Sequence, residues 1–270
     1  MKFKPKLIAL DCDGTLLDSK SRLTERTKKT LQEAIRQGIY VVIATGRMYP
    51  SALPLINEIG TTAPCVFYNG ALVRSPLTGE TYYERGLGRE LTADVVGFYL
   101  DRGWYIQMYY DDRLYVSDDE DERCKMYEGI SGIKAVALGE KFRAFSKEAD
   151  SAKVLGISRD HGIFTEMLNA TKEKYKGRLY VASSWNAFVE MVHPEVNKAR
   201  GVEKAAEAVG VAREDVMTFG DGSNDKEMIA WAGRGVAMEN GSELAKAAAD
   251  EIAPLNDEDG AAQVIERYLD

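Results

Sequence analysis

The chain has 270 residues, with 35 basic and 43 acidic side chains and a formal net charge of −8. This length can bury a substantial core without stabilising disulfides or metals, and the acidic balance excludes broad attraction to nucleic acid or anionic membranes. The three cysteines, Cys12, Cys65 and Cys124, are widely spaced and odd in number, which favours free thiols in a reducing compartment over a disulfide framework or a zinc cluster.

The N-terminal part of the chain alternates strands with a helix. Residues 6–10 (KLIAL) and 40–44 (YVVIA) are short continuous apolar runs, typical of strands that are buried on both faces. Between them, residues 24–38 predict a helix, with Thr24 as its N-cap and a glycine as its C-terminal stop. Residues 65–73 (CVFYNGALV) predict a third strand.

Residues 84–187 have a different pattern. A predicted helix (ELTADVVGFYLDRG) is followed by the strands WYIQMYY and RLYVS, and the polar turn DDR between them predicts an antiparallel hairpin. A further strand, a helix near 161–176 and a last strand follow, so we expect a separate α+β module. We interpret the acidic run at 117–122 as a solvated loop. Trp104 and Trp185 of this module either contact a ring-bearing substrate or fill its core.

The C-terminal part returns to the first pattern. Residues 215–222 (DVMTFGDG) predict another buried strand, with helices at 198–209 and 224–232 on either side. Short strands are predicted at 235–238 and 250–253.

Together these elements predict an α/β fold. We expect a Rossmann-like core with a mostly parallel sheet, built from residues 1–83 and 188–270, and an inserted α+β cap at 84–187. In such a sheet the carboxyl ends of the strands meet at one edge, where ligands bind.

Polar segments follow four of the predicted strands at that edge. They are Asp11 with Asp13, Thr45-Gly46-Arg47, Tyr68-Asn69-Gly70, and residues 220–225 (GDGSND). Lys198 opens the helix before the last of these strands. Because carboxylates within ~4–6 Å oppose one another's ionisation, we expect a divalent cation among them. Oxygen ligands suit Mg²⁺, and two histidines, His161 and His193, are too few to suggest zinc.

These residues suit phosphoryl transfer. One acid can attack phosphorus to form an aspartyl-phosphate, and a second can protonate the leaving alkoxide and then activate water. Strand alternation predicts that Asp11 and Asp13 lie on the same side and share these roles. Thr45 and Lys198 are candidates to hold the phosphoryl group, and Thr15 can pin the turn after the two acids.

The segments DCDGTLLD, ATGR, Lys198 and GDGSNDKEM resemble the four ordered motifs of the haloacid dehalogenase superfamily of phosphohydrolases. The GDGSND form of the last motif, the NGA at 69–71 and the long insertion before Lys198 resemble the Cof-type subfamily, with its C2-type α+β cap inserted after the third strand.

The resemblance implies roles at the matching positions. Asp11 would be the nucleophile and a metal ligand, and Asp13 would be the general acid/base and a ligand through its backbone carbonyl. Asp221 would bind Mg²⁺ directly, with Asn224 and Asp225 as ligands or as outer contacts that orient the ligands.

The resemblance further implies that Thr45, Gly46 and Lys198 bind phosphate. Arg47 and Asn69 are candidate substrate contacts.

Three functions remain open. We expect a cytoplasmic Mg²⁺-dependent phosphatase acting on a small organic phosphomonoester, either a sugar phosphate or a cofactor phosphate, with the cap choosing the substrate. A phosphosugar mutase would use the same intermediate, and a receiver-like phospho-switch would need about half this length and no cap. The expected partner is a small phosphorylated metabolite, without nucleic acid or membrane. The oligomeric state stays open, with a monomer favoured.

Overall fold

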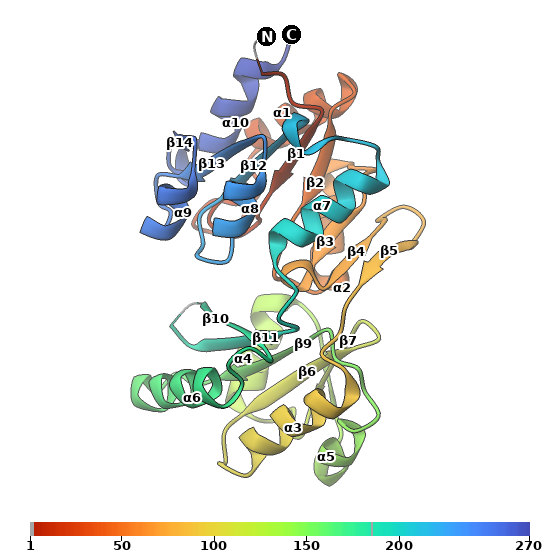
Figure 1. The fold of residues 1–270 in the computed structure, drawn as a ribbon, viewed down its shortest axis with the longest axis vertical. Coiled ribbons are helices and arrows are strands. Elements are labelled where there is room, and N and C mark those ends of the chain that lie inside the picture. The colour runs from red at the N-terminus through yellow and green to blue at the C-terminus, as the bar shows by residue number, and fades with distance from the viewer. Residues whose placement is uncertain (1–2, 185) are drawn as a thin grey trace. The chain divides into compact units, whose positions relative to one another are not determined.

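The computed structural model describes residues 3–184 and 186–270 and divides into two compact units (Figure 1). The first unit comprises Met1–Gly46, Ala52–Tyr83 and Asn197–Asp270, and the second comprises Arg47–Ser51 and Glu84–Val196. The second unit extends past the boundary at 187 that the sequence suggested, because a strand at Phe188–Val192 belongs to its sheet. Within the described ranges, no helix has the length and apolarity that crossing a membrane requires.

The first unit is built on a five-stranded parallel sheet with the order β14-β13-β12-β1-β2. Its strands are β1 (Leu7–Leu10), β2 (Tyr40–Ile43), β12 (Val216–Gly220), β13 (Arg234–Met238) and β14 (Glu251–Ala253). Figure 1 shows β1 between β12 and β2, and Leu7 pairs with Val216 on one side and Tyr40 on the other. The predicted α/β class with a parallel sheet is confirmed.

Helices alternate with these strands along the chain and follow the last one. They are α1 (Glu25–Arg36), α7 (Lys198–Ala208), α8 (Lys226–Trp231), α9 (Glu243–Ala248) and α10 (Gly260–Ile265), with short 3₁₀ segments η3 (Arg213–Asp215), η4 (Asn256–Glu258) and η5 (Glu266–Tyr268). Helix α2 (Tyr49–Ile59), which the sequence did not predict, has residues in both units. Thr24 caps α1 as predicted, because its side chain accepts the backbone N–H of Thr27 at 3.2 Å. Leu7 and Ala9 lie in one buried cluster with side chains of α7 and α8.

The predicted single strand at 65–73 is wrong. β3 (Cys65–Phe67) and β4 (Leu72–Arg74) are antiparallel, and β5 (Thr81–Glu84) completes a three-stranded sheet. Between β3 and β4 the segment η1 (Tyr68–Gly70) reverses the chain through three successive positive φ angles of 52°, 59° and 105°. A strand requires negative φ throughout, so the run has to end at Phe67.

The second unit contains a six-stranded sheet with the order β10-β11-β9-β6-β7-β8. The strands are β6 (Ile106–Tyr110), β7 (Arg113–Val116), β8 (Ala135–Ala137), β9 (Lys153–Ile157), β10 (Tyr180–Ser184) and β11 (Phe188–Val192). The predicted hairpin is β6–β7, with positive φ at both turn residues, Asp111 and Asp112. The last strand, β11, pairs with β9 and β10, which is why this unit continues beyond 187.

The helices of the second unit are α3 (Arg89–Leu100), α4 (Glu122–Ser131), α5 (Phe142–Phe145) and α6 (His161–Lys174), with the 3₁₀ segment η2 (Gly139–Lys141). The sequence did not predict α4. Asp121, within the acidic run, is its N-cap, because its side chain accepts the backbone N–H of Arg123 at 2.8 Å. The end of the run is therefore a helix start, and the rest is largely exposed.

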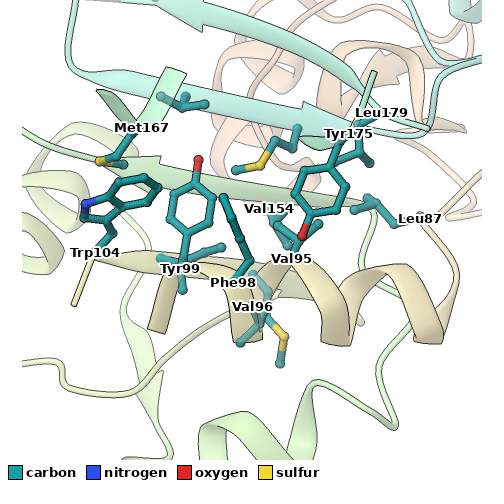
Figure 2. Packing of buried hydrophobic residues seen from close by; sticks show 14 of the residues in the cluster. Leu87, Val95, Val96, Phe98, Tyr99, Trp104, Val154, Met167, Tyr175 and Leu179 are labelled. Atoms are coloured by element: carbon teal, nitrogen blue, oxygen red, sulfur yellow. The ribbon is translucent and has the colours of Figure 1, made fainter. Parts of the chain in front are cut away.

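The core of the second unit is rich in aromatic side chains (Figure 2). Trp104 stands edge-on to Phe98 and Tyr99, with ring centroids 5.9 and 5.4 Å apart, and is 9% exposed. The hydroxyl of Tyr99 is hydrogen-bonded to that of Thr171 on α6 at 2.7 Å. Trp104 is therefore a core residue and not a substrate contact. Trp185 lies outside the described residues.

Candidate active site

The candidate site lies in the first unit, where β1, β2 and β12 end. The hydrogen-bond ladder continues one residue beyond β1, because the N–H of Asp11 donates to the carbonyl of Phe219 at 3.0 Å. Asp11, Thr45 and Asp221 thus stand just beyond three neighbouring parallel strands. The parallel sheet places all three at the same edge.

Three acids and one lysine meet at this edge. Carboxylate oxygens of Asp11, Asp221 and Asp225 lie within 4.8 Å of one another. Lys198 Nζ donates to Oδ1 of Asp11 at 2.6 Å and to Oδ1 of Asp225 at 2.7 Å. Asp11 is 7% exposed, Lys198 1% and Asp225 0%, so these three are almost entirely removed from water, whereas Asp221 is partly exposed. One buried cation therefore faces three acids.

Asp225 organises the loop that follows β12. Its Oδ1 accepts from Lys198, while its Oδ2 accepts the backbone N–H groups of Asp221 at 3.0 Å and Gly222 at 2.8 Å. Both oxygens of Asp225 thus already accept protein donors. Of the two predicted roles, ligand or outer contact, this arrangement favours the outer contact.

Asp221 is held against the turn that follows the first acids. Thr15 Oγ1 donates to Asp221 Oδ1 at 2.7 Å, and the backbone N–H of Ser242 donates to the Asp221 carbonyl at 2.8 Å. A Cβ atom on Gly14, whose φ is +84°, would lie 2.5 Å from Asp221 Oδ2. Position 14 therefore requires glycine for its conformation and for the approach of this carboxylate.

Burial and charge shift the proton affinities of these groups. Burial raises the pKa of Asp11 well above its ordinary value; Lys198 opposes this, and Asp225, Asp221 and Asp13 add to it. Burial and the charge of Asp225 raise the pKa of Asp221 to about 6. Burial alone would lower the pKa of Lys198, but the carboxylates of Asp11 and Asp225 outweigh it and raise the pKa. The ammonium is therefore charged, whereas burial and mutual repulsion favour protons on Asp11 and Asp221.

This donor set fits a hard divalent cation. The group of three acids offers only carboxylate oxygens, the ligands that Mg²⁺ prefers, and its three carboxyl groups outnumber the one ammonium of Lys198. Asp11 and Asp221 are the better candidates for ligands, because Asp225 is engaged through both oxygens.

Asp13 is close to this group without belonging to it. β1 ends at Leu10, so the strand alternation that we expected to align Asp13 with Asp11 does not extend to these positions. Asp13 instead forms an isolated bridge with Leu17 in the following turn. Its charge still raises the pKa values of Asp11 and Asp221.

The remaining predicted residues divide between the two units. Thr45 is 1% exposed, and Asn69 lies beside Gly46 and accepts a hydrogen bond from Asn224 Nδ2 at 3.1 Å. Arg47 belongs to the second unit, and its contact with substrate stays a prediction.

Two asparagines that the sequence did not single out support the turn after Asp13. Asn240 Nδ2 donates to the carbonyl of Gly14 at 2.7 Å, and Asn240 Oδ1 accepts the backbone N–H of Asn256 at 3.1 Å. Asn256 Nδ2 in turn donates to the carbonyl of Leu17 at 2.9 Å. Both follow strands of the same sheet, β13 and β14, so the strand-end argument could have found them.

Comparison with known proteins identifies the family. The family profile of the haloacid dehalogenase-like hydrolases matches residues 8–265. The chain belongs to this family. The 5-amino-6-(5-phospho-D-ribitylamino)uracil phosphatase YitU of Bacillus subtilis is 31% identical over 279 residues, which cover 100% of this chain and 99% of that protein.

Other relatives extend this comparison. The chloroplastic endoribonuclease YBEY of Arabidopsis thaliana is 32% identical over 277 residues, which are 98% of this chain but only 47% of that longer protein. A haloacid dehalogenase-like hydrolase from Bacteroides thetaiotaomicron has a crystal structure that superposes with a TM-score of 0.88 at 32% identity, covering 98% of this chain and 99% of that one. The family and the phosphatases within it make this chain an enzyme of the phosphomonoester hydrolase type.

Proposed function

We propose that this hydrolase is a Mg²⁺-dependent phosphatase that acts on a small organic phosphomonoester through an aspartyl-phosphate on Asp11. The observation that carries the proposal is the buried contact of 2.6 Å between Asp11 Oδ1 and Lys198 Nζ, within the group of three acids. The ammonium attracts the oxygens of a phosphoryl group, and the carboxylate beside it can then attack the phosphorus atom.

Asp11, Asp221 and the backbone carbonyl of Asp13 would hold the metal. A bound divalent cation would supply positive charge to the phosphoryl oxygens and relieve the repulsion among the acids.

In the first step the Asp11 carboxylate attacks phosphorus, and the bond from phosphorus to the alcohol oxygen breaks. Asp13 gives its proton to that oxygen, so that a neutral alcohol leaves. The Lys198 ammonium opposes the rise that burial causes in the pKa of Asp11 and so favours its ionised form. The same ammonium and the Thr45 hydroxyl hold the transferred oxygens.

In the second step the roles of the two acids reverse. Asp13, now ionised, takes a proton from water while the water oxygen attacks phosphorus. The bond from phosphorus to Asp11 breaks, inorganic phosphate leaves, and the Asp11 carboxylate is restored. The same pair of acids thus serves both halves of the reaction.

The names of relatives indicate which substrate to test first. Three Bacillus subtilis proteins similar to this chain, YitU, YcsE and YwtE, are named 5-amino-6-(5-phospho-D-ribitylamino)uracil phosphatases. We therefore place phosphates of sugar alcohols that carry a heterocycle at the head of the substrate panel. That the inserted cap chooses the substrate stays a prediction, as do the cytoplasmic location and the monomeric state.

Phosphate release tests the proposal. Wild-type protein is assayed with p-nitrophenyl phosphate and the panel, with Mg²⁺ and with EDTA. We expect activity that requires Mg²⁺ and no bisphosphate activator, and an Asp11→Asn variant that is slower by about 10³-fold or more. Asp215→Asn is the matched control, because Asp215 precedes the opposite end of β12 and pairs on the surface with Lys6. Equal activity of Asp11→Asn and Asp215→Asn would exclude Asp11 as the nucleophile.

A further inference from the structure

The segment η1 is strained at the position where it enters the candidate site. Tyr68, Asn69 and Gly70 all have positive φ. Glycine adopts this conformation freely and asparagine does so more often than other residues, which avoid it. Such strain persists only where surrounding contacts impose it. The contacts of Asn69 therefore show what holds η1 in this conformation.

The backbone of η1 joins two loops of the site. The N–H of Asn69 donates to the carbonyl of Thr45 at 3.0 Å, and Asn69 is 3% exposed. Its neighbour Gly70 lies against the start of α7, where a Cβ atom would stand 2.1 Å from the carbonyl oxygen of Asn197. Asn197 directly precedes Lys198. The segment η1 therefore contacts Thr45 on one side and the residue next to Lys198 on the other.

The side chain of Asn69 reaches a third loop. Its Oδ1 accepts from Asn224 Nδ2 at 3.1 Å. A Cβ atom on Gly46 would lie 2.9 Å from the same Oδ1, so the Asn69 amide occupies the space between Gly46 and Asn224. Asn224 directly precedes Asp225, which holds both Lys198 and the amides of the β12 loop.

We propose that Asn69 is a positioning residue that fixes the loop of Asn224 and Asp225 relative to Thr45. Its side chain acts through Asn224, in place of the substrate contact suggested by the sequence. The inference rests on the proposed phosphatase function, since the loops that it joins carry the residues assigned to the metal and the phosphoryl group. A misplacement of about 1 Å in such a site costs about 10²-fold in rate.

A positioning residue and a substrate contact predict different kinetics. Loss of a positioning residue lowers kcat by the same factor for every substrate, because the phosphoryl group is common to all. Loss of a contact with the leaving group raises KM or lowers the rate for some substrates only. Coupling to Asn224 is a second criterion, because two residues that act through one hydrogen bond do not have additive effects.

The experiment uses Asn69→Gly, Asn224→Ala, the double variant, and Asn57→Ala as the matched control on the exposed face of α2. Glycine keeps the positive φ without strain and removes only the side chain. Each protein is assayed with p-nitrophenyl phosphate and ribitol phosphate, and its Mg²⁺ affinity is measured by calorimetry. Thermal unfolding verifies that every variant is folded at the assay temperature.

For Asn69→Gly we expect kcat to fall by about 10- to 100-fold, equally for both substrates, with KM within about threefold of wild type. Mg²⁺ affinity should fall several-fold, and Asn69→Gly should change neither quantity further in the Asn224→Ala background. Losses that differ between substrates, losses that add, or wild-type values in Asn69→Gly would each overturn the positioning role. A wild type that releases no phosphate would instead refute the proposed function, and coupling in Mg²⁺ affinity would still decide the role of Asn69.

Discussion

Replacing Lys198 by methionine should destabilise the metal-free first unit strongly. The ammonium is 1% exposed and forms hydrogen bonds of 2.6 and 2.7 Å to Asp11 and Asp225. Methionine fills a similar volume but leaves two buried carboxylates, with Asp221 nearby, without a cation. Breaking a buried ion pair on one side costs about 3–5 kcal/mol. At about 2–4 °C per kcal/mol for a unit of this size, the melting temperature should fall by about 10 °C.

Thermal unfolding in EDTA, followed by circular dichroism at several pH values, measures this loss. The unpaired carboxylates can escape their repulsion by binding protons, so the loss should be smaller near about pH 5 than near about pH 8. Lys198→Met combined with Asp225→Asn should recover much of the stability, because one of the two orphaned charges is then gone. Lys6→Met, at an exposed surface pair, should change little. A Lys198→Met variant as stable as Lys6→Met at every pH would refute the reasoning.

Three further predictions concern stability. Gly70→Ala should lower the free energy of unfolding in urea by about 3 kcal/mol or more, because φ is +105° and the new Cβ would lie 2.1 Å from the backbone carbonyl oxygen of Asn197. The control Gly79→Ala, with φ +72° and open space around it, should lower it by about 1 kcal/mol. Equal losses for the two variants would contradict this account. The native pKa of Asp221, about 6, exceeds its ordinary value of about 3.9, so the folded state binds more protons between these values. Metal-free stability should therefore fall as the pH rises from about 4 to about 6, and Asp221→Asn should flatten this slope; an unchanged slope in calorimetry would count against it. In the second unit, Tyr99→Phe removes a buried hydrogen bond of 2.7 Å to Thr171. The free energy of unfolding should fall by about 1 kcal/mol. An unchanged value in a denaturant titration would show that this bond does not stabilise the fold.

The edge of the sheet could be predicted from the sequence because its signals are local. Asp11 and Asp221 each follow an apolar run, and the parallel connections between those runs require the strand ends to meet. The pairing of individual atoms could not be predicted. That Asp225 directs one oxygen to Lys198 and the other to two loop amides depends on contacts between segments far apart in the chain.

The misassigned segments show local signals in conflict. Residues 65–73 contain the Asn-Gly pair of a turn within a run apolar enough for one strand, and contacts with α7 decide for the turn. Helix α2 carries Pro54 in its interior and no charge in its first turn, so the usual signals for a helix are weak. In α4 the N-cap Asp121 lies within an acidic run, so its sequence does not distinguish it from the other acids of that run. For the turn at 68–70 the deciding contact, between Gly70 and Asn197, lies outside any short window of sequence.

The most direct test of the central claim is to trap the intermediate. Wild-type protein turning over p-nitrophenyl phosphate with Mg²⁺ is quenched in acid, and the peptide that contains Asp11 and Asp13 is sequenced by mass spectrometry. We predict one phosphoryl group on Asp11, labile to hydroxylamine as an acyl phosphate is, and none in Asp11→Asn. A phosphoryl group on Asp13, or steady turnover with neither acid modified at any quench time, would contradict the account.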